Sequence, residues 1–122
     1  MGSHPINLSV RFLLELVALI VFGIWGKQLN EGWTGYVWAI LFPLLVAVIW
    51  GTFAVPDDPS RSGAAPFPVS GFIRLIVEGL IFGSATFLLF KLNYPSYGWL
   101  YGVIVLIHYL ISYDRIWWLL KN

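Results

Sequence analysis

Four long apolar blocks follow one another along the 122-residue chain, at residues 8–26, 33–55, 71–90 and 97–120. Each block has about the 20 residues that an α-helix needs to cross roughly 30 Å of hydrocarbon. Apolar and polar residues do not alternate within the blocks, as they do in the strands of a membrane barrel. The pattern therefore predicts an all-α membrane protein with four transmembrane helices.

Polar connectors separate these blocks, and the middle connector differs from the other two. Residues 27–32 and 91–96 are short, whereas residues 56–70 contain four prolines and are typical of an irregular loop. We therefore expect two helical hairpins, at about 8–55 and 71–118, within a single domain that covers residues 5–122. Residues 1–4, which include His4, resemble an expression scar and are expected to have no role.

The two hairpins share a sequence pattern at an offset of 63 positions. Arg74 and Glu78 stand 63 positions after Arg11 and Glu15. Both hairpins begin on the same side of the membrane, as parallel repeats related by an axis along the membrane normal do. The pattern predicts a four-helix bundle made of two parallel, non-inverted hairpin repeats.

The composition favours a membrane protein and excludes several soluble classes. Hydrophobic residues make up 59% of the chain and charged residues only 11%, whereas a soluble domain carries about 25% charged residues. A net charge of +1 provides no basic surface for nucleic acid. There is no cysteine, and the His, Asp and Glu residues lack metal-ligand spacing. We expect no cofactor, no metal, no nucleic-acid partner and no enzymatic activity.

Charged residues inside the apolar blocks are the candidate site. Six of them are predicted to share one layer near the side that holds both termini: Arg11, Glu15, Arg74, Glu78, Asp114 and Arg115. Their three positive and three negative charges cancel. A charge at mid-bilayer costs about 2.5–3.5 kcal/mol on insertion scales, so we expect the six to pair inside the bundle. Arg115 has a second option, because it could extend outward to lipid phosphates.

Two interpretations of this layer are open. The charges form a structural ion-pair cluster that fixes how the hairpins dock, or they line a polar pocket for a proton, an ion or a small ligand. In the second case Glu15 or Glu78 would titrate. His108 lies six residues before Asp114, about 9 Å deeper along the helix. It either bonds to a neighbouring helix as a neutral imidazole or extends a proton path.

Basic residues and glycines predict orientation and partners. Five of the seven Lys and Arg residues fall on the side of the termini, namely Arg11, Arg61, Arg74, Arg115 and Lys121. This bias predicts a cytoplasmic location for both termini, with lipids around the helices. The small-residue steps Gly79/Gly83 and Gly98/Gly102 predict close helix packing within the chain or, alternatively, a homodimer face.

Several of these residues also carry a family resemblance. It rests on Asn7-Leu8, Arg11-Phe12-Leu13-Leu14-Glu15, Trp50-Gly51-Thr52-Phe53 with Pro56, Arg74 with Glu78, and Tyr113-Asp114-Arg115. Together they resemble the bacterial YrdB-like proteins over nearly the whole chain after residue 4. That family consists of small four-span membrane proteins without an established activity, so the resemblance implies a fold and a bacterial origin but no reaction.

The sequence therefore predicts a small integral membrane protein with a structural or accessory role. The alternative function is a small proton- or ion-coupled carrier, or a lipophilic-ligand-binding protein, that uses Glu15, Glu78 and Asp114.

Overall fold

The computed structural model describes residues 5–56 and 65–122, and most of them are helical. The helices are α1 (Pro5–Lys27), α2 (Trp33–Thr52), α3 (Gly71–Lys91), α4 (Pro95–Ile111) and α5 (Tyr113–Lys121). Two strands of two residues each, β1 (Phe53–Ala54) and β2 (Phe67–Pro68), pair in parallel between α2 and α3. The predicted scar at residues 1–4, and Arg61 of the middle connector, lie outside the described residues.

Three of the helices, α1, α2 and α3, are long and apolar enough to cross a membrane. The fourth apolar block is different, because α4 and α5 qualify only as a pair and are bent by 68° at the break between them. The prediction of one continuous helix over 97–120 is therefore wrong. The bend packs α5 against α3 and so brings Arg115 to Glu78, which a straight continuation of α4 would not do.

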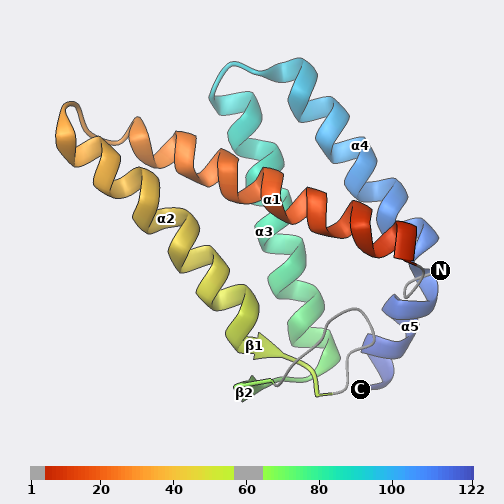
Figure 1. Ribbon diagram of the computed structural model, residues 1–122. Coiled ribbons are helices and arrows are strands. Elements are labelled where there is room, and N and C mark those ends of the chain that lie inside the picture. The colour runs from red at the N-terminus through yellow and green to blue at the C-terminus, as the bar shows by residue number, and fades with distance from the viewer. Residues whose placement is uncertain (1–4, 57–64) are drawn as a thin grey trace.

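Two of the turns between helices lie at the same end of the molecule (Figure 1). One turn joins α1 to α2 and the other joins α3 to α4, while the two strands and both described chain ends lie toward the opposite end. α1 crosses α3 in the middle of the molecule (Figure 1), and α3 also contacts α2, α4 and α5. α3 is thus the helix on which the others meet.

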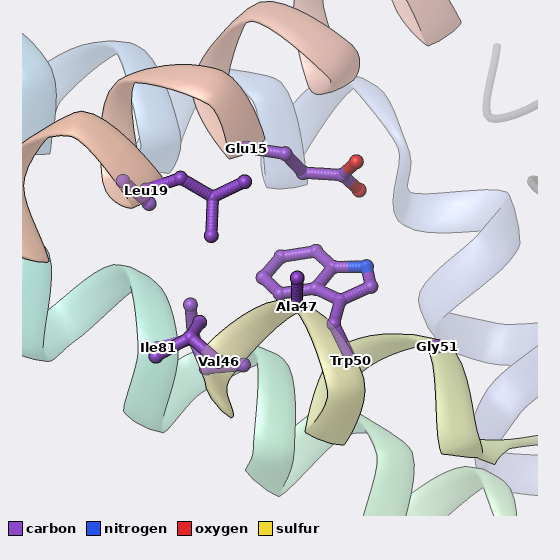
Figure 2. A pocket seen from close by; sticks show the side chains of 8 residues that line it. Glu15, Leu19, Val46, Ala47, Trp50, Gly51 and Ile81 are labelled. Carbon is purple, nitrogen blue, oxygen red and sulfur yellow. The ribbon is translucent and has the colours of Figure 1, made fainter. Parts of the chain in front are cut away.

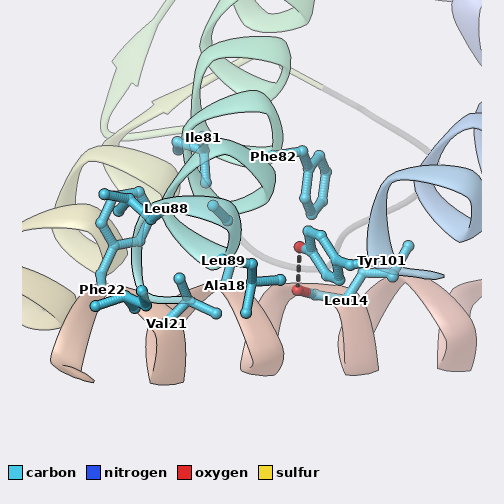
Figure 3. Packing of buried hydrophobic residues seen from close by; sticks show 11 residues of the cluster. Leu14, Ala18, Val21, Phe22, Ile81, Phe82, Leu88, Leu89 and Tyr101 are labelled. Atoms are coloured by element: carbon cyan, nitrogen blue, oxygen red, sulfur yellow. Dashed lines mark hydrogen bonds between the residues drawn. The ribbon is translucent and has the colours of Figure 1, made fainter. Parts of the chain in front are cut away.

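The core lies mainly between α1 and α3 (Figure 3). From α1, Leu14, Ala18, Val21 and Phe22 are buried, at the spacing of a single helix face. They pack against a matching face of α3 and one residue of α4, namely Ile81, Phe82, Ala85, Leu88, Leu89 and Tyr101. The Tyr101 hydroxyl also donates a hydrogen bond of 2.8 Å to the carbonyl of Leu14 (Figure 3).

The glycines of the two predicted small-residue steps have different surroundings. A Cβ atom at Gly98 would meet the ring of Phe90, and one at Gly102 would meet Thr86. These two glycines therefore let α4 approach α3 within the chain. A Cβ atom at Gly79 or Gly83 would meet no neighbouring element within 4 Å, and both glycines line an open groove beside Tyr109.

Candidate functional site

The carboxylate of Glu78 is the centre of a buried polar cluster, and its side chain is 0% exposed. Its Oε2 atom lies 2.8 Å from Arg74 Nε, 2.8 Å from Arg11 Nη2 and 2.8 Å from Arg115 Nη2. Its Oε1 atom accepts hydrogen bonds of 2.9 Å from Arg115 Nη1 and 2.7 Å from the Tyr109 hydroxyl. One carboxylate thus binds three guanidinium groups, and the pair with Arg115 is bidentate.

These partners come from different parts of the chain. Arg74 lies one helical turn before Glu78 on α3, whereas Arg11 belongs to α1, Tyr109 to α4 and Arg115 to α5. Ser70 caps the N-terminus of α3 by accepting a hydrogen bond from the backbone N–H of Ile73, which fixes the turn that carries Arg74. The cluster therefore joins α1, α3, α4 and α5 at a single carboxylate.

Arg74 also connects the cluster to the end of α2. Its Nη1 atom donates hydrogen bonds of 2.5 Å to the carbonyl of Trp50 and 2.7 Å to the carbonyl of Phe53. Carbonyl groups in the last turn of a helix have no partner within that helix. Arg74 thus supplies donors to the C-terminus of α2 while its Nε atom binds Glu78, and α1 to α5 all contribute to or contact the cluster.

The indole of Trp50 covers one side of the cluster. The guanidinium carbons of Arg11 and Arg74 lie 5.7 Å and 5.4 Å from the centre of its ring, within the range of cation–π interactions. Trp50 also packs edge-to-face on Phe82 at 5.1 Å. No sequence signal indicates this role, or the contact of Tyr109 with Glu78, because both residues are separated from their partners by more than 20 positions.

The membership of the cluster differs from the predicted neutral layer of six. Glu15 is 26% exposed, and its Oε1 atom lies 3.3 Å from Arg11 Nε. Asp114 is exposed at the start of α5, whereas its neighbour Arg115 is buried. Consecutive residues of a helix point about 100° apart, so α5 buries one of the two and exposes the other. Asp114 therefore lies at the exposed side of α5 and not among the buried groups around Glu78.

His108 belongs to a second buried polar group beside the cluster. Its Nδ1 atom lies 3.0 Å from Asn7 Oδ1, and Asn7 Nδ2 donates a hydrogen bond of 2.6 Å to the hydroxyl of Ser112. This contact ties the break between α4 and α5 to the first turns of α1. Sequence reasoning misses Asn7, although its position four residues before Arg11 places it on the same helix face. Among the described residues, Arg11 Nη1 and His108 Nε2 are buried without a hydrogen-bond partner.

A pocket opens next to the cluster, between α1, α2 and α3 (Figure 2). Glu15 and Trp50 line one part of it, and Leu19, Val46 and Ile81 form apolar walls (Figure 2). Its volume is about 220 Å³, which is below the 300–1,000 Å³ of typical ligand pockets. In the part of the chain that the structure describes, no three His, Asp or Glu side chains are grouped to hold a metal ion.

Comparisons with known proteins give a consistent result. The family model described as "Protein of unknown function (DUF2568)" matches residues 9–106. The chain is also similar to the uncharacterized protein YrdB of Bacillus subtilis (strain 168), with 40% identity over 116 residues, which cover 95% of this chain and 94% of YrdB. No solved structure matches the chain.

Proposed function

The chain belongs to the DUF2568 family of proteins of unknown function, and we propose that it is a structural or accessory membrane protein without catalytic activity. The observation that carries this proposal is the sharing of the Glu78 carboxylate by three arginines from three helices. In this role the cluster is a clamp that holds both hairpins in one arrangement.

The clamp is supported by the way in which each charged group is used. Glu78 is 0% exposed and its two oxygens bind Arg11, Arg74, Arg115 and Tyr109. Removing one partner from a buried ion pair costs about 3–5 kcal/mol, so opening this site to load a proton would be expensive. A carrier needs a carboxylate that exchanges its partners readily. Of the two carboxylates in the cluster, the partly exposed Glu15 beside the pocket has more of that freedom.

We propose that the chain as a whole forms a four-helix bundle of two parallel repeats, which the clamp holds together. Its support is that the helix ends keep nearly the offset of 63 positions seen in the sequence. α1 ends at Lys27 and α3 at Lys91, while α2 begins at Trp33 and α4 at Pro95. The break after Ile111 departs from the repeat, since α2 is continuous at the equivalent position.

The bacterial cytoplasmic membrane is the proposed location, with both termini in the cytoplasm and lipids around the helices. Arg11, Arg74 and Arg115 lie near the beginnings of α1, α3 and α5, and these helix ends lie toward the chain termini (Figure 1). Lys27 and Lys91 lie in the last turns of α1 and α3 at the other end. Excess positive charge on the cytoplasmic side is typical of membrane proteins.

Proton flux in reconstituted vesicles separates a clamp from a carrier. We expect vesicles that contain the wild type to lose an imposed pH gradient no faster than protein-free vesicles do, and we expect the same of the Glu15→Gln variant. The reason is that the carboxylates do not cycle between the two sides of the membrane. An entrapped pH-sensitive dye would follow the gradient. Fast dissipation by the wild type that Glu15→Gln abolishes, in a variant that still folds, would establish a carrier and refute the clamp as the main role.

A further inference from the structure

We propose that α5 lies along the surface of the membrane, with the side chains of Tyr113, Trp117 and Leu120 at the boundary between lipid headgroups and acyl chains. This interaction surface rests on the proposed membrane location and goes beyond it, because it gives the C-terminal helix a lipid partner. The sequence predicts that the fourth span continues to residue 120, whereas here the chain leaves the bilayer core at Ser112.

The exposed face of α5 is suited to this boundary. Tyr113, Trp117 and Leu120 are 71%, 60% and 53% exposed, and their spacing places them on one side of the helix. Arg115 and Leu119 are buried on another side, where α5 contacts α3. The apolar residues therefore face away from the protein and are available to lipid.

Charged groups lie at the edge of this apolar face. Lys121 Nζ is 4.8 Å from the centre of the Trp117 ring, and the carboxylate residue Asp114 is exposed in the first turn. Tryptophan and tyrosine are enriched at membrane–water interfaces, and a lysine beside them can cover apolar surface with its stem while its charge stays in water. A short helix with aromatic residues on one side and charges beside them is typical of helices that lie in the interface plane.

The length of α4 places α5 at the right depth. α4 has 17 residues, which correspond to about 25 Å of helix at 1.5 Å per residue. It therefore crosses most of a hydrocarbon layer of about 30 Å before the chain reaches Ser112. The bend of 68° between α4 and α5 then turns the chain from the direction of a span toward the membrane plane.

A matched set of single-cysteine variants tests this placement, because the 122-residue chain has no cysteine. Tyr113→Cys, Leu120→Cys and Asp114→Cys would each carry a nitroxide label in vesicles of phosphatidylethanolamine and phosphatidylglycerol. Collision with oxygen and with a water-soluble nickel chelate reports the depth of each label. Tyr113 and Leu120 are about 10 Å apart along the helix axis, so their depths compare the two orientations directly.

We expect the labels at 113 and 120 to be shallow, oxygen-accessible and within about 5 Å of each other in depth, because α5 runs nearly parallel to the surface. The label at 114 should be reached by the nickel chelate. A depth difference of about 10 Å between 113 and 120 would show a spanning helix and overturn the proposal. Free access of the nickel chelate to both apolar positions would overturn it as well.

Ile40→Cys provides the control for the membrane location itself. Ile40 is 70% exposed and lies within α2, far from α5 in the sequence. A deep, oxygen-accessible label at 40 together with water-exposed labels on α5 would support the membrane location and refute only the surface placement of α5. A label at 40 that the nickel chelate reaches would refute the membrane location, and the surface helix with it.

Discussion

Replacement of Glu78 by leucine is expected to destabilise the fold by about 3–5 kcal/mol, the loss that follows when one partner of a buried ion pair is removed. The substitution leaves Arg11, Arg74 and Arg115 buried without the carboxylate that they share. Leucine has a similar volume, so the loss would come from unpaired charge more than from a cavity. Thermal or denaturant unfolding of the purified protein in a mild detergent would measure it.

Glu15→Leu is the matched control, because Glu15 is the equivalent residue one hairpin earlier. Its side chain is 26% exposed and approaches one arginine at 3.3 Å. Exposed ion pairs contribute about 0–1 kcal/mol, so the control should lose much less stability than Glu78→Leu does. Equal losses for the two variants would mean that Glu78 has no special place in the fold.

A second large effect is expected at Gly71, where α3 meets α5. A Cβ atom at this position would overlap the backbone carbonyl of Leu119, and neither backbone can give way by a rotamer change. Gly71→Ala should therefore push α5 from α3, weaken the contact of Arg115 with Glu78 and destabilise the protein by about 1–3 kcal/mol. The unfolding midpoint in detergent would show this loss.

Gly79→Ala is the control on the same helix. A Cβ atom there would meet no neighbouring element within 4 Å, and alanine is favoured over glycine inside a helix by about 1 kcal/mol. We expect this variant to unfold at the wild-type midpoint or above it. If both alanine variants behave alike, the close approach of α3 and Leu119 does not stabilise the fold.

The helices of the first hairpin and α3 could be predicted well from the sequence, because long apolar segments flanked by polar turns determine them locally. The predicted segments begin at residues 33 and 71, where α2 and α3 begin. The fourth block could not be divided by the same reasoning, since hydrophobicity continues through Ile111 to Leu120. Its break depends on tertiary contacts, namely Ser112 with Asn7 and Arg115 with Glu78.

Most charged residues of the candidate site could be predicted from the sequence, but the central place of Glu78 among them could not. Arg11 with Glu15 and Arg74 with Glu78 have the same local spacing, so periodicity alone assigns them equal roles. Glu15 and Glu78 differ in the partners that the second half of each hairpin provides, at positions that are 63 residues apart. Tyr109 and Arg115 contact Glu78, whereas Val46 and Thr52 occupy the equivalent positions, and Val46 lines the pocket beside Glu15.

The positions of two residues relative to the cluster could be known only from the three-dimensional contacts. Asp114 belongs to the predicted charged layer but is exposed, because the buried side of α5 is taken by Arg115 and Leu119. Trp50 has no part in the predicted layer, yet its ring lies against Arg11 and Arg74. Both follow from how helices rotate when they pack, which a single sequence does not specify.

The coupling energy between Arg11 and Glu78 decides most directly whether charge holds the two hairpins together, since Arg11 lies on α1 and Glu78 on α3. Unfolding free energies of Arg11→Gln, Glu78→Gln and the double variant form a double-mutant cycle. We expect the double variant to lose less stability than the sum of the single losses, with a coupling of about 1–3 kcal/mol. Additive losses, with a coupling near zero, would contradict the clamp.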